Sequence, residues 1–130
     1  MIKGETKFWH EIKAFNIKNN CKLSFTRLEN SAAHGTPDLL VYNSFSNFFT
    51  VELKVTRGNK IRFSPHQIAF HIKHPNNTFI LVSRLSDRGS KLSVHLYKGE
   101  SISQLAACGL ELDACCLGLD ASINYLKNLN

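Results

Sequence analysis

Hydrophobic side chains in the first 18 residues recur with the 3.6-residue period of an amphipathic helix. A helix over residues 5–18 gathers its apolar side chains on one face, which consists of Phe8, Trp9, Ile12 and Phe15. Glu5 lies within this apolar face, whereas Glu11 lies on its edge. Because a carboxylate is costly to bury without a partner or a function, Glu5 is the more informative of the two acids.

The rest of the chain predicts strands separated by turns and shorter helices. Strands are expected where apolar side chains alternate or run together, at 22–29, 38–43, 48–55, 78–85 and 91–98. Further helices are expected at 65–74, 101–108 and 121–129. This order of elements predicts an α/β fold with one central mixed β-sheet flanked by helices. Since 130 residues is the length of one such domain, residues 1–130 are expected to form a single domain.

Local signals mark where these helices begin and end. Ser64 followed by Pro65 is typical of an N-cap and a first helical position, and Pro75 is expected to stop that helix. Gly109 is expected to end the helix at 101–108, and Asp120 is a candidate cap for the last helix.

The two runs at 38–43 and 48–55 predict a β-hairpin with a turn at 44–47. Asn43 would then face Phe48, and antiparallel pairing would place Asp38 near Glu52 and Leu53. Glu52 and Lys54 are two residues apart on one strand and therefore share a face. The opposite face of this strand is expected to belong to the core and consists of Val51, Leu53 and Val55.

This hairpin gathers an aspartate, a glutamate and a lysine in one cluster. Two neighbouring carboxylates repel each other unless a cation lies between them, and hard oxygen ligands favour Mg²⁺ or Mn²⁺. Such an ion with Lys54 beside it is suited to hydrolysis of a phosphodiester bond. Glu-x-Lys is a weak motif on its own. The same residues are therefore also consistent with a ladder of surface salt bridges on a half-exposed sheet.

The charges are unevenly distributed along the chain, whose net charge is +6. Residues 1–75 contain 11 basic and 5 acidic side chains, whereas residues 76–130 contain 5 of each. A basic half indicates a polyanionic partner, most often nucleic acid, although solubilising lysines give the same pattern.

Composition excludes several other classes of protein. No run reaches the 18 or so apolar residues of a membrane helix, and the first residues lack the apolar stretch of a signal peptide. A cytoplasmic protein with no membrane partner is therefore expected. The cysteines are expected to be reduced and buried; they are Cys21, Cys108, Cys115 and Cys116.

Three short motifs occur in order along the chain. They are Gly35-Thr36-Pro37-Asp38, Glu52-Leu53-Lys54 and Ser64-Pro65-His66-Gln67. The series resembles the PD-(D/E)XK nuclease superfamily, most closely its VRR-NUC branch and the related phage and archaeal Holliday-junction resolvases. The resemblance covers about residues 5–85 and implies a restriction-endonuclease-like αβββαβ core. Residues 86–130 match no part of it and form a C-terminal extension without an assigned role.

The resemblance implies roles for individual residues. Asp38 and Glu52 match the metal-binding carboxylates, and Glu5 matches a further metal-binding glutamate on the first helix. Lys54 matches the catalytic lysine, and Gln67 matches a glutamine that supports the site. The implied activity is Mg²⁺- or Mn²⁺-dependent endonucleolytic hydrolysis of DNA, selective for Holliday junctions or other branched structures. A homodimer acting in recombination, repair or phage DNA processing, in the host cytoplasm, fits the same resemblance.

Other polar side chains are candidates for contact with the nucleic acid. Arg27 lies on the strand before the first motif, and His34 directly precedes Gly35. Three more candidates lie between Lys54 and the second helix: Arg57, Lys60 and Arg62. Three histidines are expected to contact solvent or the DNA backbone: His66, His71 and His74. Six aromatic residues are expected in the core rather than stacked on bases: Phe8, Trp9, Phe48, Phe49, Phe63 and Phe79.

Two other functions compete with the nuclease. The first is a catalytically inert nucleic-acid-binding module on the same fold, and the second is a basic protein that binds an acidic surface of another protein. The complete set of acids and Lys54 argues against the inert module, because an inert descendant has no reason to retain them. Metal-dependent cleavage separates the nuclease from both alternatives.

Overall fold

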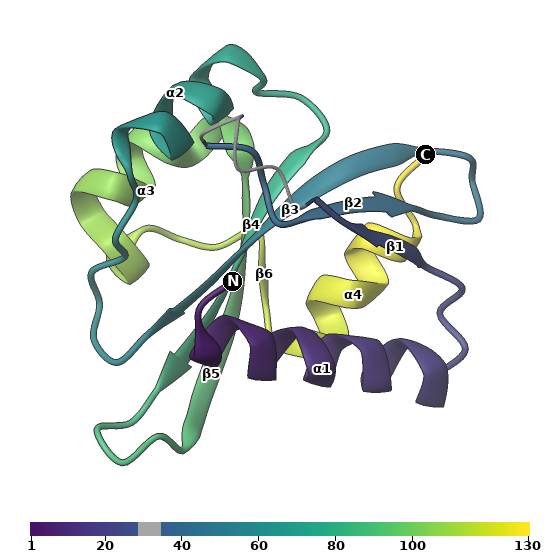
Figure 1. Cartoon of the computed structure of the whole chain (residues 1–130), viewed down its shortest axis with the longest axis horizontal. Coiled ribbons are helices and arrows are strands. Elements are labelled where there is room, and N and C mark those ends of the chain that lie inside the picture. Colours follow the sequence, from purple (N-terminus) through teal and green to yellow (C-terminus); the bar gives the residue numbers. More distant parts are fainter. Residues whose placement is uncertain (29–34) are drawn as a thin grey trace.

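The structure, a computed structural model, describes residues 1–28 and 35–130 (Figure 1). The last residue of the predicted strand at 22–29 lies outside these ranges, which leave out residues 29–34. The strands are β1 (Ser24–Arg27), β2 (Leu39–Tyr42), β3 (Phe48–Thr56), β4 (Thr78–Leu85), β5 (Lys91–Lys98) and β6 (Cys116–Leu117). The α-helices are α1 (Lys3–Lys18), α2 (Pro65–Lys73), α3 (Ile102–Cys108) and α4 (Leu119–Lys127). Short 3₁₀ turns lie on either side of α3, at Gly99–Ser101 and Gly109–Glu111.

The strands form one six-stranded mixed sheet in which each strand lies beside its neighbours in sequence. α2 returns the chain to the end of the sheet at which β3 begins, so β4 runs parallel to β3. All other neighbouring strands pair antiparallel. The single-domain α/β fold with a central mixed sheet is therefore confirmed, including the αβββαβ order of its first six elements.

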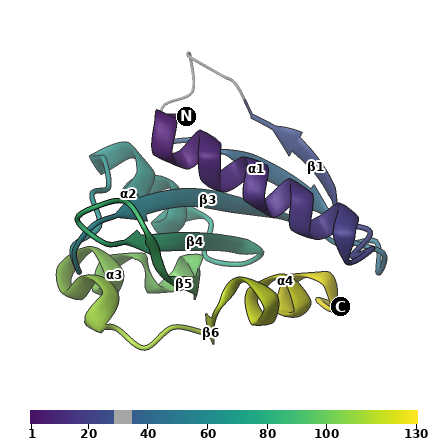
Figure 2. The same ribbon diagram turned by 90° about the horizontal axis from the view of Figure 1, so that it is seen from below.

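Helices cover both faces of the sheet. α1 and α4 pack on one face, where Phe8, Trp9 and Ile12 meet Ile123 and Leu126 in the larger core (Figure 1). α2 and α3 lie on the other face, over a smaller core that includes Ile80, Val82, Tyr97, Ile102 and Leu105. The start of α1 and the start of α2 lie near the same end of β3 (Figure 2). That end of β3 carries the candidate chemistry.

The β2–β3 turn differs by one residue from the predicted turn. Tyr42, not Asn43, pairs with Phe48. The Asn43 side chain accepts hydrogen bonds from the backbone N–H groups of Phe45 and Asn47, each at 3.1 Å, so Asn43 belongs to the turn. Side-chain bonds of this kind are typical of asparagine in turns.

The C-terminal part of the chain departs from prediction at two points. β6 is not predicted, since two residues are too few to show a hydrophobic period. Gly118, not Asp120, is the N-cap of α4, and it provides no side-chain cap. The helix therefore begins at Leu119, two residues before the expected start.

Two expectations about burial are partly wrong. All four cysteines are free, but only Cys21 is buried, whereas Cys108 and Cys115 are exposed. Phe48 is 58% exposed because it lies at the hairpin end, where its ring contacts the Tyr42 ring at 4.4 Å between centroids. In the described ranges, no helix is both long and apolar enough to cross a membrane.

Candidate active site

Asp38 and Glu52 form a pair of carboxylates at the base of the candidate site. Leu39 pairs with Val51, so Asp38, one residue earlier, lies beside Glu52 on the next strand. The backbone N–H of Leu53 donates a hydrogen bond of 2.8 Å to Asp38 Oδ2, which fixes the orientation of this carboxylate. The predicted proximity of Asp38 to Glu52 and Leu53 is confirmed.

Glu52 is buried at an electrostatic cost. Its side chain is 2% exposed, and within the described ranges its Oε1 atom has no hydrogen-bond partner. Burial raises the pKa of Glu52 far above its ordinary value, and a hydrogen bond and the negative charge of Asp38 raise it further, while Lys54 acts in the opposite direction. A carboxyl group in this state is suited to binding a cation, which would replace the missing partner.

Lys54 is held by the first turn of α2. Its Nζ atom donates a hydrogen bond of 2.9 Å to Gln67 Oε1 and lies 5.1 Å from the centroid of the Phe63 ring. Gln67 Oε1 also accepts from the backbone N–H of Ser64 at 3.0 Å, and Ser64 Oγ accepts from the Gln67 N–H at 3.1 Å. This reciprocal capping box fixes the Gln67 side chain, which in turn positions the ammonium group.

A glycine joins the first and third motifs. Gly35 has φ +83°, and a Cβ atom there would collide with the carbonyl group of His66 in the first turn of α2. The loop that leads to Asp38 thus lies directly against the helix that carries Gln67. Only glycine combines this backbone conformation with so close an approach.

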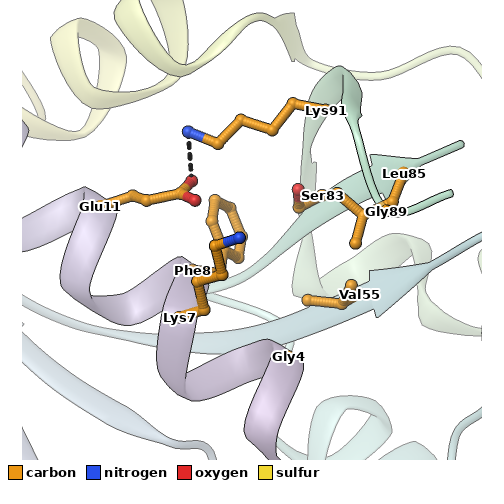
Figure 3. Close-up of a pocket in the computed structure, with 9 residues that line it drawn as sticks. All are labelled: Gly4, Lys7, Phe8, Glu11, Val55, Ser83, Leu85, Gly89 and Lys91. Carbon is orange, nitrogen blue, oxygen red and sulfur yellow. Dashed lines mark ion pairs between the residues drawn. The ribbon is translucent and has the colours of Figure 1, made fainter.

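The two glutamates of α1 have different surroundings in the structure. Burial raises the pKa of Glu5, the charge of Asp38 raises it further and Lys54 lowers it, so Glu5 lies within electrostatic reach of the site. Glu5 also accepts a backbone hydrogen bond at Ile2, as a glutamate at the third helical position often does. Glu11 is instead paired with Lys91 on β5, with 2.6 Å between Oε2 and Nζ (Figure 3).

An open cleft of about 470 Å³ lies beside these side chains. Its lining includes Glu5, Lys54 and Gln67 together with three basic residues, Arg57, Lys60 and Arg62. The structure therefore brings three of the predicted nucleic-acid contacts to the site.

The two other predicted contacts are Arg27 and His34. Arg27 is the last residue of β1, opposite Leu39, and it is not among the residues that line this cleft. The prediction for His34 cannot be placed, because His34 lies outside the described residues.

His71 is the residue that sequence reasoning placed wrongly. It is fully buried on α2, and its Nδ1 atom lies 2.8 Å from the Gln67 carbonyl oxygen. A carbonyl only accepts, so Nδ1 carries the proton, and burial lowers the pKa of the imidazole. The four-residue spacing from Gln67 is the signal for this contact, since residues i and i+4 of a helix are neighbours. His66 and His74 are exposed, as predicted.

The carboxylates fit a divalent cation of the hard type. Mg²⁺ is commonly held by one or two carboxylates, completed by water and substrate phosphate. Asp38 and the unpartnered Oε1 of Glu52 offer such a pair. Among residues 1–28 and 35–130, no three His, Cys, Asp or Glu side chains are grouped closely enough to hold a metal ion. The role of Glu5 as a third ligand stays a prediction.

Comparison of the chain with protein-family models, curated proteins and solved structures finds no match. The chemistry available at the site is therefore argued from its own residues.

Proposed function

We propose that this protein is a metal-dependent endonuclease that hydrolyses phosphodiester bonds in DNA. The observation that carries the proposal is the pairing of Asp38 with the buried Glu52, with Lys54 fixed beside them by Gln67. Burying a carboxyl group is costly when one of its oxygens has no partner within the described residues, and a sheet has no structural need of such a group at Glu52. The resemblance of the three motifs to PD-(D/E)XK nucleases supports the same activity.

Each residue has a defined task in this proposal. Asp38 and Glu52 would hold the Mg²⁺ or Mn²⁺ ion, whose positive charge polarises a phosphoryl oxygen and lowers the pKa of a water molecule. Lys54 donates hydrogen bonds toward the phosphate or the attacking water and offsets the charge that develops in the transition state. Gln67 keeps the Lys54 ammonium at this position.

The surroundings of the pair support a polyanionic substrate. Lys60 and Arg62 line the same cleft as Glu5, Lys54 and Gln67, and their positive charges support contact with phosphates of the substrate. Branched DNA, including four-way junctions, is the substrate class that the motif resemblance favours. A homodimer, which light scattering can detect, would place two such sites for paired cuts.

A nuclease assay tests the proposal directly. Labelled four-way junction, flap, linear duplex and single-stranded DNA are incubated with the protein in Mg²⁺, Mn²⁺ or EDTA, beside Lys54→Ala and Asp38→Asn. We expect cleavage that requires the metal and is lost in both variants, while DNA binding is largely retained. Tight binding without cleavage of any substrate would contradict the proposal and favour the inert binding module.

A further inference from the structure

The segment that joins β3 to α2 needs support from outside itself. Residues 57–62, here called the basic loop, have no helical or strand structure, yet they bring Lys60 and Arg62 to the cleft. A loop free to move would lose much conformational entropy on binding a phosphate backbone. Thr56, the last residue of β3, holds the first part of the loop, since its Oγ1 atom donates to the Lys60 carbonyl oxygen at 2.8 Å and accepts from the Gly58 N–H at 3.3 Å. Further contacts come from residues 86–130, the part of the chain without an assigned role.

The first of these contacts is the turn after α3. The backbone N–H of Leu110 donates a hydrogen bond of 2.8 Å to the Asn59 carbonyl oxygen. Gly109 has φ +62°, and a Cβ atom there would collide with that same carbonyl group. Ile61, the buried residue of the loop, packs in the same core cluster as Leu105 and Leu110. The turn after α3 therefore touches the loop through backbone and side chain together.

The second contact is the turn between β4 and β5. Arg57 Nη1 donates a hydrogen bond of 2.6 Å to the Asp87 carbonyl oxygen, and Gly89 lies next to the same guanidinium group. Arg57 is thus directed toward this turn, which leaves Lys60 and Arg62 as the cations that face the cleft without this tether.

The same β4–β5 hairpin also supports α1. Gly89 and Lys91 line a small cavity of about 40 Å³ together with Phe8, and Lys91 pairs with Glu11 at its rim (Figure 3). One hairpin therefore contacts both the helix that carries Glu5 and the basic loop.

We propose that residues 86–130 act as a clamp that holds the basic loop in position to receive a nucleic-acid backbone, with Gly109 as its positioning residue. The inference rests on the proposed function for the identity of the polyanion. Because the contacts from Leu110, Gly109 and Asp87 are made with the loop, the clamp supports substrate binding rather than the bond-breaking step.

Two glycines provide a matched comparison. Gly109→Ala places a methyl group against Asn59, whereas at Gly118, with φ +93°, a Cβ atom meets nothing within 4 Å in the described part of the chain. Both substitutions carry the strain of a positive φ, so Gly118→Ala is the control for that strain. Arg57→Met and Arg62→Met form a second pair. Arg57→Met removes the hydrogen bond to the Asp87 carbonyl group, whereas Arg62→Met removes a candidate phosphate contact.

The readouts are affinity for a fluorescent 20-base-pair DNA at several salt concentrations, hydrogen exchange of the amides at 57–62, and kcat with KM for cleavage. Relative to Gly118→Ala, we expect Gly109→Ala to weaken binding by at least about fivefold and to reduce the salt slope by about 1–2. KM should rise while kcat stays within about twofold, since the transition-state contacts are untouched. The loop amides should exchange faster in Gly109→Ala and Arg57→Met, but not in Arg62→Met.

Several outcomes would overturn the clamp. These are unchanged affinity in Gly109→Ala despite faster loop exchange, a loss confined to kcat, or equal effects of Gly109→Ala and Gly118→Ala. If Gly109→Ala does not fold, unchanged loop exchange in Arg57→Met overturns it. A wild-type protein that binds DNA without cutting it refutes the nuclease, while affinity and exchange still decide on the clamp. A wild-type protein that does not bind DNA refutes both.

Discussion

The two faces of β3 follow opposite rules. Toward α1 and α4, Val51 and Leu53 are buried among apolar side chains in the larger core. Toward α2, Glu52 is equally buried, but it has an unpartnered oxygen and its neighbour Lys54 is charged. The first face is what stability requires, whereas the second carries an electrostatic cost that an apolar side chain would avoid. Along β3, the side chains on one face thus contribute to the stability of the fold, and those on the other face form part of the candidate site.

The sharpest test of this comparison uses adjacent residues. Leu53→Ala leaves a cavity in the core and should lower the free energy of unfolding by about 2–5 kcal/mol. The raised pKa keeps Glu52 protonated in EDTA, and glutamine is close in shape to that neutral carboxyl, so Glu52→Gln should leave the free energy of unfolding nearly unchanged in EDTA, while cleavage in Mg²⁺ falls by more than about 100-fold. Denaturant unfolding and cleavage rates measure the two effects. Equal destabilisation by both substitutions would make Glu52 a structural residue.

Gly35 tests how the loop before Asp38 depends on α2. Gly35→Ala should lower the free energy of unfolding by about 1–3 kcal/mol, because the backbone is left-handed and the methyl group meets His66. It should also reduce cleavage beyond that loss, as Asp38 is displaced. Gly118→Ala is the control, since φ there is also positive, at +93°, and a Cβ atom meets nothing within 4 Å among the described residues. Normal activity in a folded Gly35→Ala protein would show that the loop does not position Asp38.

The two glutamates of α1 give a smaller contrast. Glu5→Gln should lower kcat/KM about tenfold, which corresponds to about 1.4 kcal/mol, because Glu5 is coupled to Asp38 and Lys54. Glu11→Gln should leave kcat/KM unchanged and cost less than about 1 kcal/mol of stability, since it removes a surface ion pair with Lys91. Cleavage kinetics at saturating metal compare them. Equal losses of activity would remove Glu5 from the site.

His71 provides the smallest expected effect. Burial holds the pKa of His71 below its ordinary value of 6.5, so the stability that its neutral form contributes is present above about pH 6.5 and is lost as the pH falls through the folded-state pKa. Unfolding between pH 7.5 and 5.5 should therefore be less pH-dependent in His71→Asn, by at most about 1.4 kcal/mol per pH unit. His10→Asn changes an exposed histidine and serves as the control. A slope identical to wild type would exclude His71 as the titrating group.

The hydrophobic periodicity of the sequence was sufficient to predict most of the helices and strands. The apolar face of α1 predicted which side chains are buried, since Phe8, Trp9 and Ile12 are all core residues. Ser64 followed by Pro65 predicted where α2 begins, because this start is decided locally, by the N-cap and its hydrogen bonds with Gln67. The cluster of Asp38 and Glu52 followed from hairpin pairing even though the register was one residue off, since neighbouring registers leave the two acids close.

The remaining features depend on tertiary contacts that no local pattern reports. Asn43 changes the register through a side-chain bond that competes with strand pairing. His71 is buried in part by an element far away in sequence, because Gly99 lies next to its ring. The clamp on the basic loop uses the backbone carbonyl groups of Asn59 and Asp87, which leave no trace in side-chain identity.

Asn43 also has a consequence for the order of folding. Its Nδ2 group donates to the carbonyl oxygens of Leu126 and Leu129, 83 and 86 positions along the chain, at 3.1 and 2.8 Å. Contacts of such long range form late and slow the folding of a domain. During synthesis, the β2–β3 hairpin emerges from the ribosome well before these carbonyls, so the larger core stays open until α4 is released. A stalled or truncated chain would therefore expose the apolar face of α1 and the sheet to aggregation.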